Sequence, residues 1–425
     1  MKFTKINSLK GEIQVPGDKS ISHRAIMFGA ISEGKTRVRN FLQGADCLST
    51  IDCFGKMGIM IENNITEVLI EGKGLRGLNK PAQILDTGNS GTTTRLISGI
   101  LAGQNFSCEL TGDASIQRRP MKRIIDPLTQ MGAKICSIKN NGCAPLRIEP
   151  STIKGIHYQS KVASAQVKSA ILLAGLYGSE ATSVTEPYVS RNHSEIMLNY
   201  FGGNVTTSET TATIVPNPIL QGQDIIVPGD ISSAAFFIVA GLIVPNSEIY
   251  LKNVGINPTR DGIIKVCKQM GGNVTLLNVN TANGEPTADI LVKSSELHGI
   301  EIGGELIPTL IDEIPIIALL ACFAKGKTII KDAEELKVKE SNRLDVMVNN
   351  LKAMNADIIA TNDGMIIKGG SPLIGTVIDS EDDHRIAMTF AIAGLVAEGT
   401  VEILKSECVA ISYPNFYTNL EALYR

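Results

Sequence analysis

The chain has 425 residues, of which 43% are hydrophobic, 4% are aromatic and none is tryptophan, and its formal net charge is −3. This length predicts two domains, and the charge leaves no broad basic surface for a nucleic acid. No hydrophobic run reaches about 18 residues, and the first residues lack a signal core, so we expect a cytoplasmic protein with no membrane partner. The eight cysteines form no C-x-x-C pair, which disfavours zinc ribbons and favours free thiols.

The first informative segment reads VPGDKSISHR at residues 15–24, and the same four letters return in VPGDISSAAF at residues 227–236. Each copy predicts a strand, a Pro-Gly turn and a helix that begins near a serine. Only the first copy carries Lys19 and Arg24. We therefore expect the first copy to face a substrate and the second to serve the fold.

One order of elements recurs six times: a polar residue, a hydrophobic helix, a glycine turn, a β-like run and a second helix. The repeats begin 68 to 80 residues apart, at Ser20, Ser90, Ser164, Ser232, Asp312 and Asp383. This spacing is longer than the about 20–50 residues of a solenoid repeat and fits a small α/β unit. First helices such as AAFFIVAGLIV and PIIALLACFA are hydrophobic on nearly every side, which predicts buried helices wrapped by strands.

Two glycine-rich stretches match nucleotide-binding motifs in the wrong context. GAISEGKT at residues 29–36 matches the P-loop, but a helical pattern precedes it and a strand pattern follows it, the reverse of the required order. We interpret its Gly34, and Gly326 in AKGKTIIK, as helix C-cap glycines. GKGLRG at residues 72–77 leads into LNKP, which cannot start a helix, so we interpret it as a surface turn.

Several helix starts combine capping residues with cations or amides that capping does not need. A helix N-terminus presents free N–H groups and about half a positive charge, so it attracts anions. If the repeats are related by pseudo-symmetry, their helix starts converge on one surface, a cleft suited to a polyanionic small molecule. The starts concerned are Lys19-Ser20, residues 89–92, residues 164–166 and Asp383-His384-Arg385.

Two further charged stretches carry an alternative interpretation as solvated faces. QRRPMKR supplies Arg119, and KVKESNR predicts a helical turn with Lys339 and Arg343 on one face. Asp312 and Glu340 belong to the same repeat, and a carboxylate among cations stays ionised at neutral pH and can act as a base.

Eight motifs in chain order carry a family resemblance: DKSISHRA, GNSGTTTRL, RRPM, VASAQVKSA, GDISSAAFF, IDEIPIIALLA, LKVKESNRLD and DDHRIAM. Together they resemble the 5-enolpyruvylshikimate-3-phosphate (EPSP) synthase family over essentially the whole chain. The resemblance implies a two-domain inside-out α/β barrel, each domain built of three βαβαββ units with buried helices. We expect one domain from residues 1–14 and 228–425, the other from residues 15–227, and a hinge near residues 14–18 and 226–230.

The resemblance also implies a reaction. The enolpyruvyl group of phosphoenolpyruvate (PEP) would pass to the 5-hydroxyl of shikimate 3-phosphate, releasing phosphate through a tetrahedral intermediate on the shikimate pathway to chorismate and aromatic amino acids. No metal or organic cofactor is implied, glyphosate is the expected inhibitor, and we expect a monomer. Both substrates are anionic, as the cleft requires.

Residue roles follow from the resemblance, motif by motif. The implied ligands of shikimate 3-phosphate are Lys19, Ser20, Arg24, Ser164, Ala165, Gln166, Asp312 and Lys339. Those of PEP are Lys19, Gly91, Arg119, Gln166, Arg343 and Arg385. Asp312 would take the proton of the 5-hydroxyl, and Glu340 with Lys19 would carry the methylene proton. Further candidates are Asn89, Thr92, Ser190 and His384.

Three positions bear on the fit to this family. Ala165 stands where many relatives have serine. Ile411 stands where some have a PEP-binding lysine, and with Lys405 as the nearest lysine that contact stays open. Gly91 predicts glyphosate sensitivity, because a methyl group there narrows the PEP pocket in insensitive relatives.

Three alternative functions remain to be weighed. An enolpyruvyl transferase acting on a UDP-sugar usually carries a cysteine in the loop that holds QRRPM, whereas none lies between Cys108 and Cys136. An ATP-dependent phosphotransferase would need a true P-loop. A non-catalytic anion-binding protein would not need Asp312 and Glu340 among cations.

Overall fold

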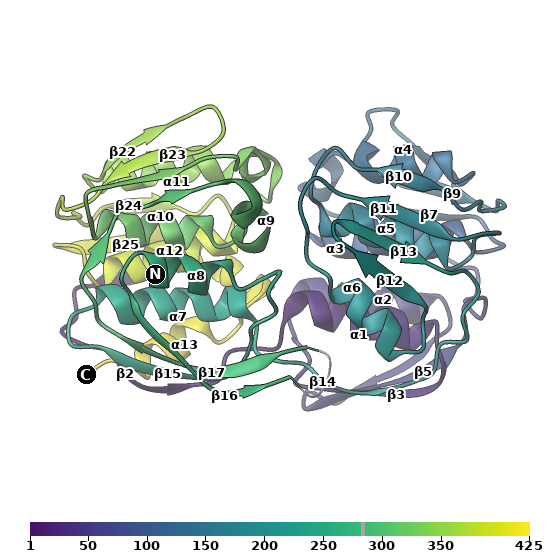
Figure 1. The fold of residues 1–425 in the computed structure, drawn as a ribbon, viewed down its shortest axis with the longest axis horizontal. Coiled ribbons are helices and arrows are strands. Elements are labelled where there is room, and N and C mark those ends of the chain that lie inside the picture. The colour runs from purple at the N-terminus through teal and green to yellow at the C-terminus, as the bar shows by residue number, and fades with distance from the viewer. Residues whose placement is uncertain (282–284) are drawn as a thin grey trace. The chain divides into compact units, whose positions relative to one another are not determined.

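The computed structural model describes residues 1–281 and 285–425. The chain divides into two compact units, one formed by residues 1–16 with 228–425 and the other by residues 17–227 (Figure 1). Each unit encloses its own hydrophobic core. The predicted inside-out α/β fold is confirmed, because helices fill the interior of each unit and sheets surround them.

The unit of residues 17–227 repeats one βαβαββ pattern three times. Its first copy contains α1 (Lys19–Ala30), β3 (Glu33–Arg39), α2 (Ala45–Lys56), β4 (Met60–Asn63) and β5 (Glu67–Lys73), with β14 (Asp224–Ile226) as leading strand. The second contains β6 (Leu85–Asp86), α3 (Gly91–Ala102), β7 (Cys108–Thr111), α4 (Lys122–Gln130), β8 (Lys134–Ser137) and β9 (Leu146–Glu149). The third contains β10 (His157–Gln159), α5 (Ala165–Gly175), β11 (Thr182–Thr185), α6 (His193–Tyr200), β12 (Val205–Ser208) and β13 (Thr211–Ile214). In each copy the leading strand runs parallel to the second, and the other pairs are antiparallel.

The unit that contains both termini follows the same plan. Its first copy has β2 (Lys10–Ile13) leading α7 (Ile231–Ile243), β15 (Glu248–Gly255), α8 (Gly262–Gln269), β16 (Asn273–Asn280) and β17 (Thr287–Lys293). The second has β18 (Leu297–His298), β19 (Glu301–Ile302), α9 (Ile307–Leu310), α10 (Ile314–Cys322), β20 (Ala324–Lys325), β21 (Lys327–Ile330), α11 (Arg343–Ala353), β22 (Asp357–Ala360) and β23 (Met365–Lys368). The third has β24 (Val377–Asp379), α12 (His384–Gly394), β25 (Thr400–Leu404) and α13 (Phe416–Glu421), closed by the antiparallel β1 (Lys2–Thr4).

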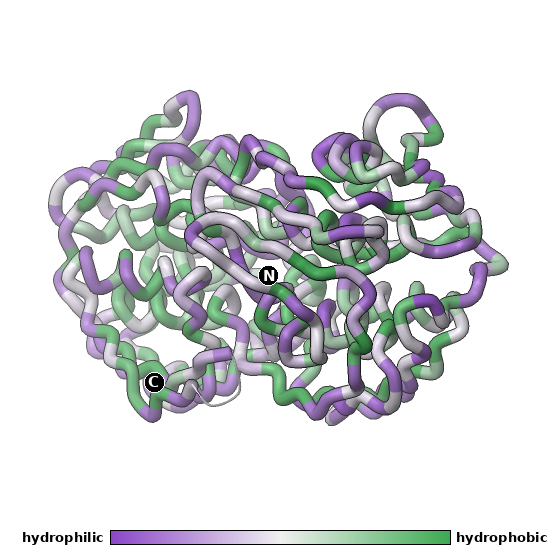
Figure 2. The backbone as a smooth tube through the Cα atoms, turned by 45° about the vertical axis from the view of Figure 1, so that its right-hand side comes forward, coloured by the Kyte–Doolittle hydropathy of each residue, from purple (hydrophilic) through white to green (hydrophobic). Residues whose placement is uncertain are grey.

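The first helix of each repeat lies at the centre of its unit. Every residue of α7 and α10 is buried, as the hydrophobic sequence predicts. Figure 1 shows α7, α10 and α12 inside one unit and α1, α3 and α5 inside the other. Hydrophobic stretches alternate with hydrophilic turns along the chain (Figure 2). Among the described residues no helix has both the length and the hydrophobicity needed to span a bilayer.

The two VPGD segments mark the places where the chain passes from one unit to the other. The carboxylate of Asp18 accepts the N–H of Ile21 at 2.9 Å and caps α1, and that of Asp230 accepts the N–H of Ser232 at 2.8 Å and caps α7. Both copies therefore begin a central helix, as predicted, and the hinge at these segments stays a prediction.

The interpretation of Gly34 and Gly326 as helix C-caps is wrong. The helix α1 ends at Ala30, and Gly34 lies within β3 with a φ of +83°, while Gly326 separates β20 from β21 with a φ of +95°. Glycine is required there because the chain turns through the left-handed region as a strand begins. The P-loop is also excluded, since GAISEGKT ends in a strand and no helix follows it directly.

We predict opposite effects for alanine at two helical glycines. A Cβ atom at Gly99 in α3 would lie 2.2 Å from the carbonyl oxygen of Ala170 in α5, so Gly99→Ala should destabilise the protein by about 1–3 kcal/mol. Gly55 in α2 is exposed with nothing within 4 Å of such a Cβ, so Gly55→Ala should stabilise by about 0.5–1 kcal/mol. Urea unfolding of both variants tests the close packing of α3 against α5. Equal changes in the free energy of unfolding for the two variants would contradict it.

Candidate active site

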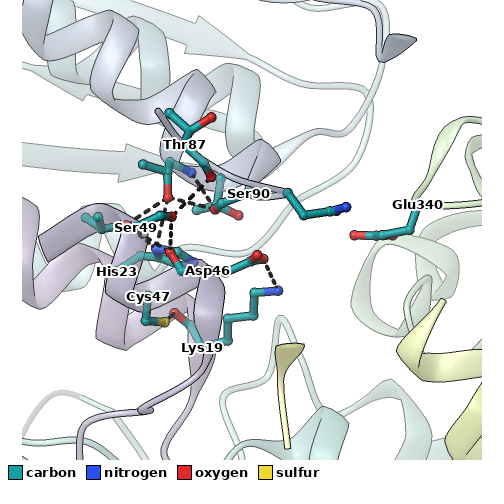
Figure 3. Close-up of polar contacts among 12 residues, drawn as sticks. Lys19, His23, Asp46, Cys47, Ser49, Thr87, Ser90 and Glu340 are labelled. Atoms are coloured by element: carbon teal, nitrogen blue, oxygen red, sulfur yellow. Dashed lines mark hydrogen bonds and ion pairs between the residues drawn. The ribbon is translucent and has the colours of Figure 1, made fainter. Parts of the chain in front are cut away.

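The start of α1 places two cations of the first VPGD copy. The ammonium of Lys19 forms an ion pair with the carboxylate of Asp46 at the start of α2 (Figure 3). The buried guanidinium of Arg24 donates to the hydroxyls of Ser194 at 2.7 Å and Ser169 at 3.0 Å. Lys19 and Arg24 are thus held in place by side chains from α2, α5 and α6.

Behind Lys19, His23 belongs to a buried chain of hydroxyl groups. Its Nδ1 lies 2.8 Å from Oγ1 of Thr50, which lies 2.8 Å from Oγ1 of Thr93, which in turn donates to Oγ of Ser90 at 2.7 Å. Burial lowers the pKa of His23 well below its usual value, and the charges of Lys19 and Arg24 lower it further. A neutral His23 therefore connects α1 with α2 and, through Thr50 and Thr93, with α3.

The start of α3 gathers the predicted PEP ligands of this unit. Nη1 of Arg119 donates to the carbonyl of Asn89 at 3.3 Å, and Nε2 of Gln166 donates to Oγ1 of Thr92 at 3.0 Å. A Cβ atom at Gly91 would lie 3.1 Å from Nη1 of Arg119. The absence of a side chain at Gly91 thus leaves room between the helix start and a guanidinium.

Sequence reasoning missed Arg95, which contributes to the same region. Its Nη1 donates to the amide oxygen of Gln166, and it also lies 3.1 Å from the position of a Gly91 Cβ. Arg95 lies one turn beyond Gly91 in α3. The arginine of GNSGTTTRL was the available signal.

Sequence reasoning also missed a cluster of buried charged side chains that contacts the start of α5. Glu186 accepts the N–H of Ser164 at 2.8 Å and the hydroxyl of Ser190 at 2.7 Å. The ammonium of Lys168 lies 3.1 Å from Glu186 and 2.7 Å from Glu195. Burial opposes the charge of Lys168, but the two carboxylates outweigh it and raise its pKa. The predicted ligands Ser164 and Ser190 are therefore tied to one carboxylate.

In the unit with both termini, Arg343 collects three carboxylates. It is 1% exposed and lies 2.7 Å from Asp383, 2.6 Å from Glu340 and 3.2 Å from Asp312. Burial opposes the ionisation of Asp383, but Arg343 outweighs it and lowers the pKa of that carboxyl. The two predicted proton carriers, Asp312 and Glu340, are thus brought to one guanidinium.

Lys339 and Arg343 do not share a helical face, which corrects the sequence prediction. A 3₁₀ helix ends at Val338, and α11 begins at Arg343 because Asn342 caps it by accepting the N–H of Asp345. The ammonium of Lys339 nevertheless lies 3.5 Å from Asp312.

The start of α12 adds another cation to this group. Nη1 of Arg385 donates to the backbone carbonyl of Asp312 at 3.2 Å and lies 3.5 Å from the carboxylate of Glu313. The neighbouring His384 is buried at the first position of α12. Lys405, the lysine nearest to Ile411, lies 3.2 Å from Asp379, and its side chain is about half exposed.

The predicted site residues therefore fall into two groups, one in each unit, and within each group they contact shared partners. One group occupies the starts of α1, α3 and α5, with Ser190 and Arg119 on the adjoining loops. The other occupies the segments before α10 and α11 and the first residues of α11 and α12. In the part of the chain that the structure describes, no cluster of three or more His, Cys, Asp or Glu side chains could hold a metal ion.

Known proteins resemble this chain over its full length. The family model described as EPSP synthase (3-phosphoshikimate 1-carboxyvinyltransferase) matches residues 3–420. A 3-phosphoshikimate 1-carboxyvinyltransferase of Thermoanaerobacter sp. strain X514 is 58% identical, covering 98% of each chain, and that of Geobacillus kaustophilus is 56% identical, covering 99% of each. The structure of EPSP synthase from Acinetobacter baumannii superposes with a TM-score of 0.88 at 46% identity, covering 100% of this chain and 98% of that one. The enolpyruvyl transferase NikO from Streptomyces tendae shares the fold, with a TM-score of 0.80 at 15% identity over 99% of this chain and 96% of that one.

The depressed pKa of His23 predicts a loss of stability on acidification. Below about pH 6.5 this histidine binds a proton in the unfolded chain but stays neutral in the folded chain. The free energy of unfolding therefore falls by up to about 1.4 kcal/mol for each unit by which the pH is lowered, until the pH reaches the pKa of the folded state. His23→Gln should flatten the fall in thermal midpoint between about pH 7.5 and 5.5. The exposed His157, changed in the same way, is the control, and equal pH profiles for both variants would contradict the assignment.

Proposed function

The chain belongs to the EPSP synthase family, and from that premise we propose which of its residues carry the reaction. It transfers the enolpyruvyl group of PEP to the 5-hydroxyl of shikimate 3-phosphate and releases phosphate, a step of the shikimate pathway. The main support for the proposed roles is that the carboxylates of Asp312 and Glu340 both form ion pairs with Arg343. The reaction needs one base and one acid beside cations.

Asp312 is the proposed base for the 5-hydroxyl. Its carboxylate faces the positive charges of Arg343 at 3.2 Å and Lys339 at 3.5 Å, which favour the ionised form that can accept a proton. Lys339 would hold the shikimate ring in reach of this carboxylate. The position of Asp312 is further fixed by its backbone carbonyl, which accepts from Arg385.

Glu340 and Lys19 are the proposed carriers of the methylene proton. Protonation of PEP at C3 gives a cationic centre at C2, the oxygen of the 5-hydroxyl then adds to C2, and loss of phosphate is accompanied by removal of a proton from the C3 methyl group. Glu340 lies 2.6 Å from Arg343, and Lys19 pairs with Asp46, so each proton carrier starts beside a group of opposite charge.

The anionic groups of the substrates would replace these internal partners. We assign shikimate 3-phosphate to the N-termini of α1 and α5, through Lys19, Ser20, Arg24 and residues 164–166, because free N–H groups and cations bind phosphate there. Ser190 belongs to the same set through its shared partner Glu186.

PEP would take Gly91 and Arg119 from one unit, Arg343 and Arg385 from the other, and Lys19 and Gln166 beside both substrates. Asn89, Thr92 and His384 adjoin these ligands along the chain. We further propose a hinge near residues 14–18 and 226–230, because the chain passes from one unit to the other there. We also propose a cytoplasmic monomer, which fits two small soluble substrates.

The direct test is phosphate release by purified protein with shikimate 3-phosphate and PEP, without ATP and with a chelator. We expect turnover that requires both substrates. Asp312→Asn should lower kcat by about 10²–10⁴, because it removes the base, while calorimetry still detects binding of shikimate 3-phosphate. Absence of release by the wild-type protein would refute the activity, and near-normal turnover of the variant would refute the role of Asp312.

Glyphosate inhibition tests the assignment of PEP to Gly91. The wild-type enzyme should be inhibited in competition with PEP, and Gly91→Ala should raise both the inhibition constant and the KM for PEP, because the new methyl group meets Arg119 at 3.1 Å. The KM for shikimate 3-phosphate is the internal control and should stay constant. A variant that remains as sensitive as the wild type would place PEP elsewhere.

A further inference from the structure

The second VPGD copy carries a buried polar chain that leads to the proposed PEP ligand Arg385. Aligned from the shared VPGD, Ser232 stands in the second copy where Ser20 stands in the first. Ser232 is 3% exposed, and its hydroxyl donates to the carboxylate of Glu313, which follows the proposed base Asp312 directly. The serine of the second copy is therefore linked to the catalytic segment.

The oxygen of Ser232 is itself held by a cation. Nη2 of Arg260 donates to it at 2.6 Å and lies 3.4 Å from the capping carboxylate of Asp230. Arg260 is 2% exposed, and Asp230 is also buried. A hydroxyl that accepts from a guanidinium is polarised, so it donates more strongly to the next acceptor.

Glu313 connects Ser232 to Arg385. Its carboxylate lies 3.5 Å from Nη1 of Arg385, a looser contact than the 2.6–2.7 Å pairs that Arg343 makes nearby. The side chain of Glu313 is fully buried, and its Oε2 makes no hydrogen bond with the residues that the structure describes. Ser232 is thus the hydroxyl that holds this buried carboxylate.

We propose that Ser232 and Glu313 are positioning residues for Arg385, and so set the affinity for PEP. This inference rests on the proposed assignment of Arg385 to PEP. With Ser232 in place, Glu313 is partly satisfied and contacts Arg385 only loosely, which leaves the guanidinium available to an anionic substrate. Without the hydroxyl, the buried carboxylate turns to Arg385 for its hydrogen bonds and competes with PEP.

The sharpest test compares Ser232→Ala with Ser233→Ala, two neighbouring buried serines of α7. Ser232→Ala keeps the backbone N–H that Asp230 caps, so the helix start survives. It should raise the KM for PEP by about 10-fold, which is the size of effect expected when one hydrogen bond to a charged group is lost. The KM for shikimate 3-phosphate should change little. Ser233→Ala, whose hydroxyl is outside the chain of contacts, should leave both KM values unchanged.

A double-mutant cycle shows whether Ser232 acts through Glu313. In a Glu313→Gln background the buried charge is gone, so adding Ser232→Ala should change the KM for PEP by less than about twofold. An unchanged KM for PEP in Ser232→Ala, an equal rise in both KM values, or the same 10-fold effect in the Glu313→Gln background would overturn the inference. Wild-type turnover in the same assay separates this failure from failure of the proposed function.

Discussion

The structure depends on central helices that are buried on nearly every side. Such a helix cannot leave a face in water, so each unit must surround its three central helices with sheets. The ends of these helices also need polar groups, because their first N–H groups have no partner within the helix. Asp18, Ser90, Asp230 and Asp383 supply those partners through their side chains. The constraint that buries the helices therefore also collects the chemistry at their N-termini.

Cations gathered at these N-termini would repel one another and the helix dipoles. The structure offsets this with carboxylates: Asp46 pairs with Lys19, and three acids surround Arg343. Arg343 in turn stabilises the charge of Asp383, whose pKa it lowers. The acids hold the cations in place, and in the proposed mechanism the phosphates and carboxylates of the substrates replace them. Two of these acids, Asp312 and Glu340, are also the proposed proton carriers.

Local sequence patterns predicted the features that residues close together in the chain determine. Hydrophobic runs located the central helices, and capping residues located their starts. The pattern failed at Lys339, because Asn342 interrupts the expected turn and starts a new helix. It could not find Glu186 or Glu313, because their partners include Ser164 and Ser232, 22 and 81 residues away. Buried acids of this kind are recognisable only when the fold shows which cations and hydroxyls surround them.

The two VPGD segments lie where the strand that precedes a central helix belongs to the sheet of the other unit. The strand before α1, β2, joins the sheet of the α7 repeat, whereas the strand before α7, β14, joins the sheet of the α1 repeat. Each VPGD therefore separates a strand of one unit from a helix of the other. At the first copy the position after the cap holds Lys19, and one residue later comes Ser20. At the second, Ile231 replaces the cation, and Ser232 turns inward to Arg260 and Glu313. Where the first copy has the proposed substrate ligand Lys19, the second has Ile231, and the serine that follows contacts Glu313 at the start of the neighbouring helix α10.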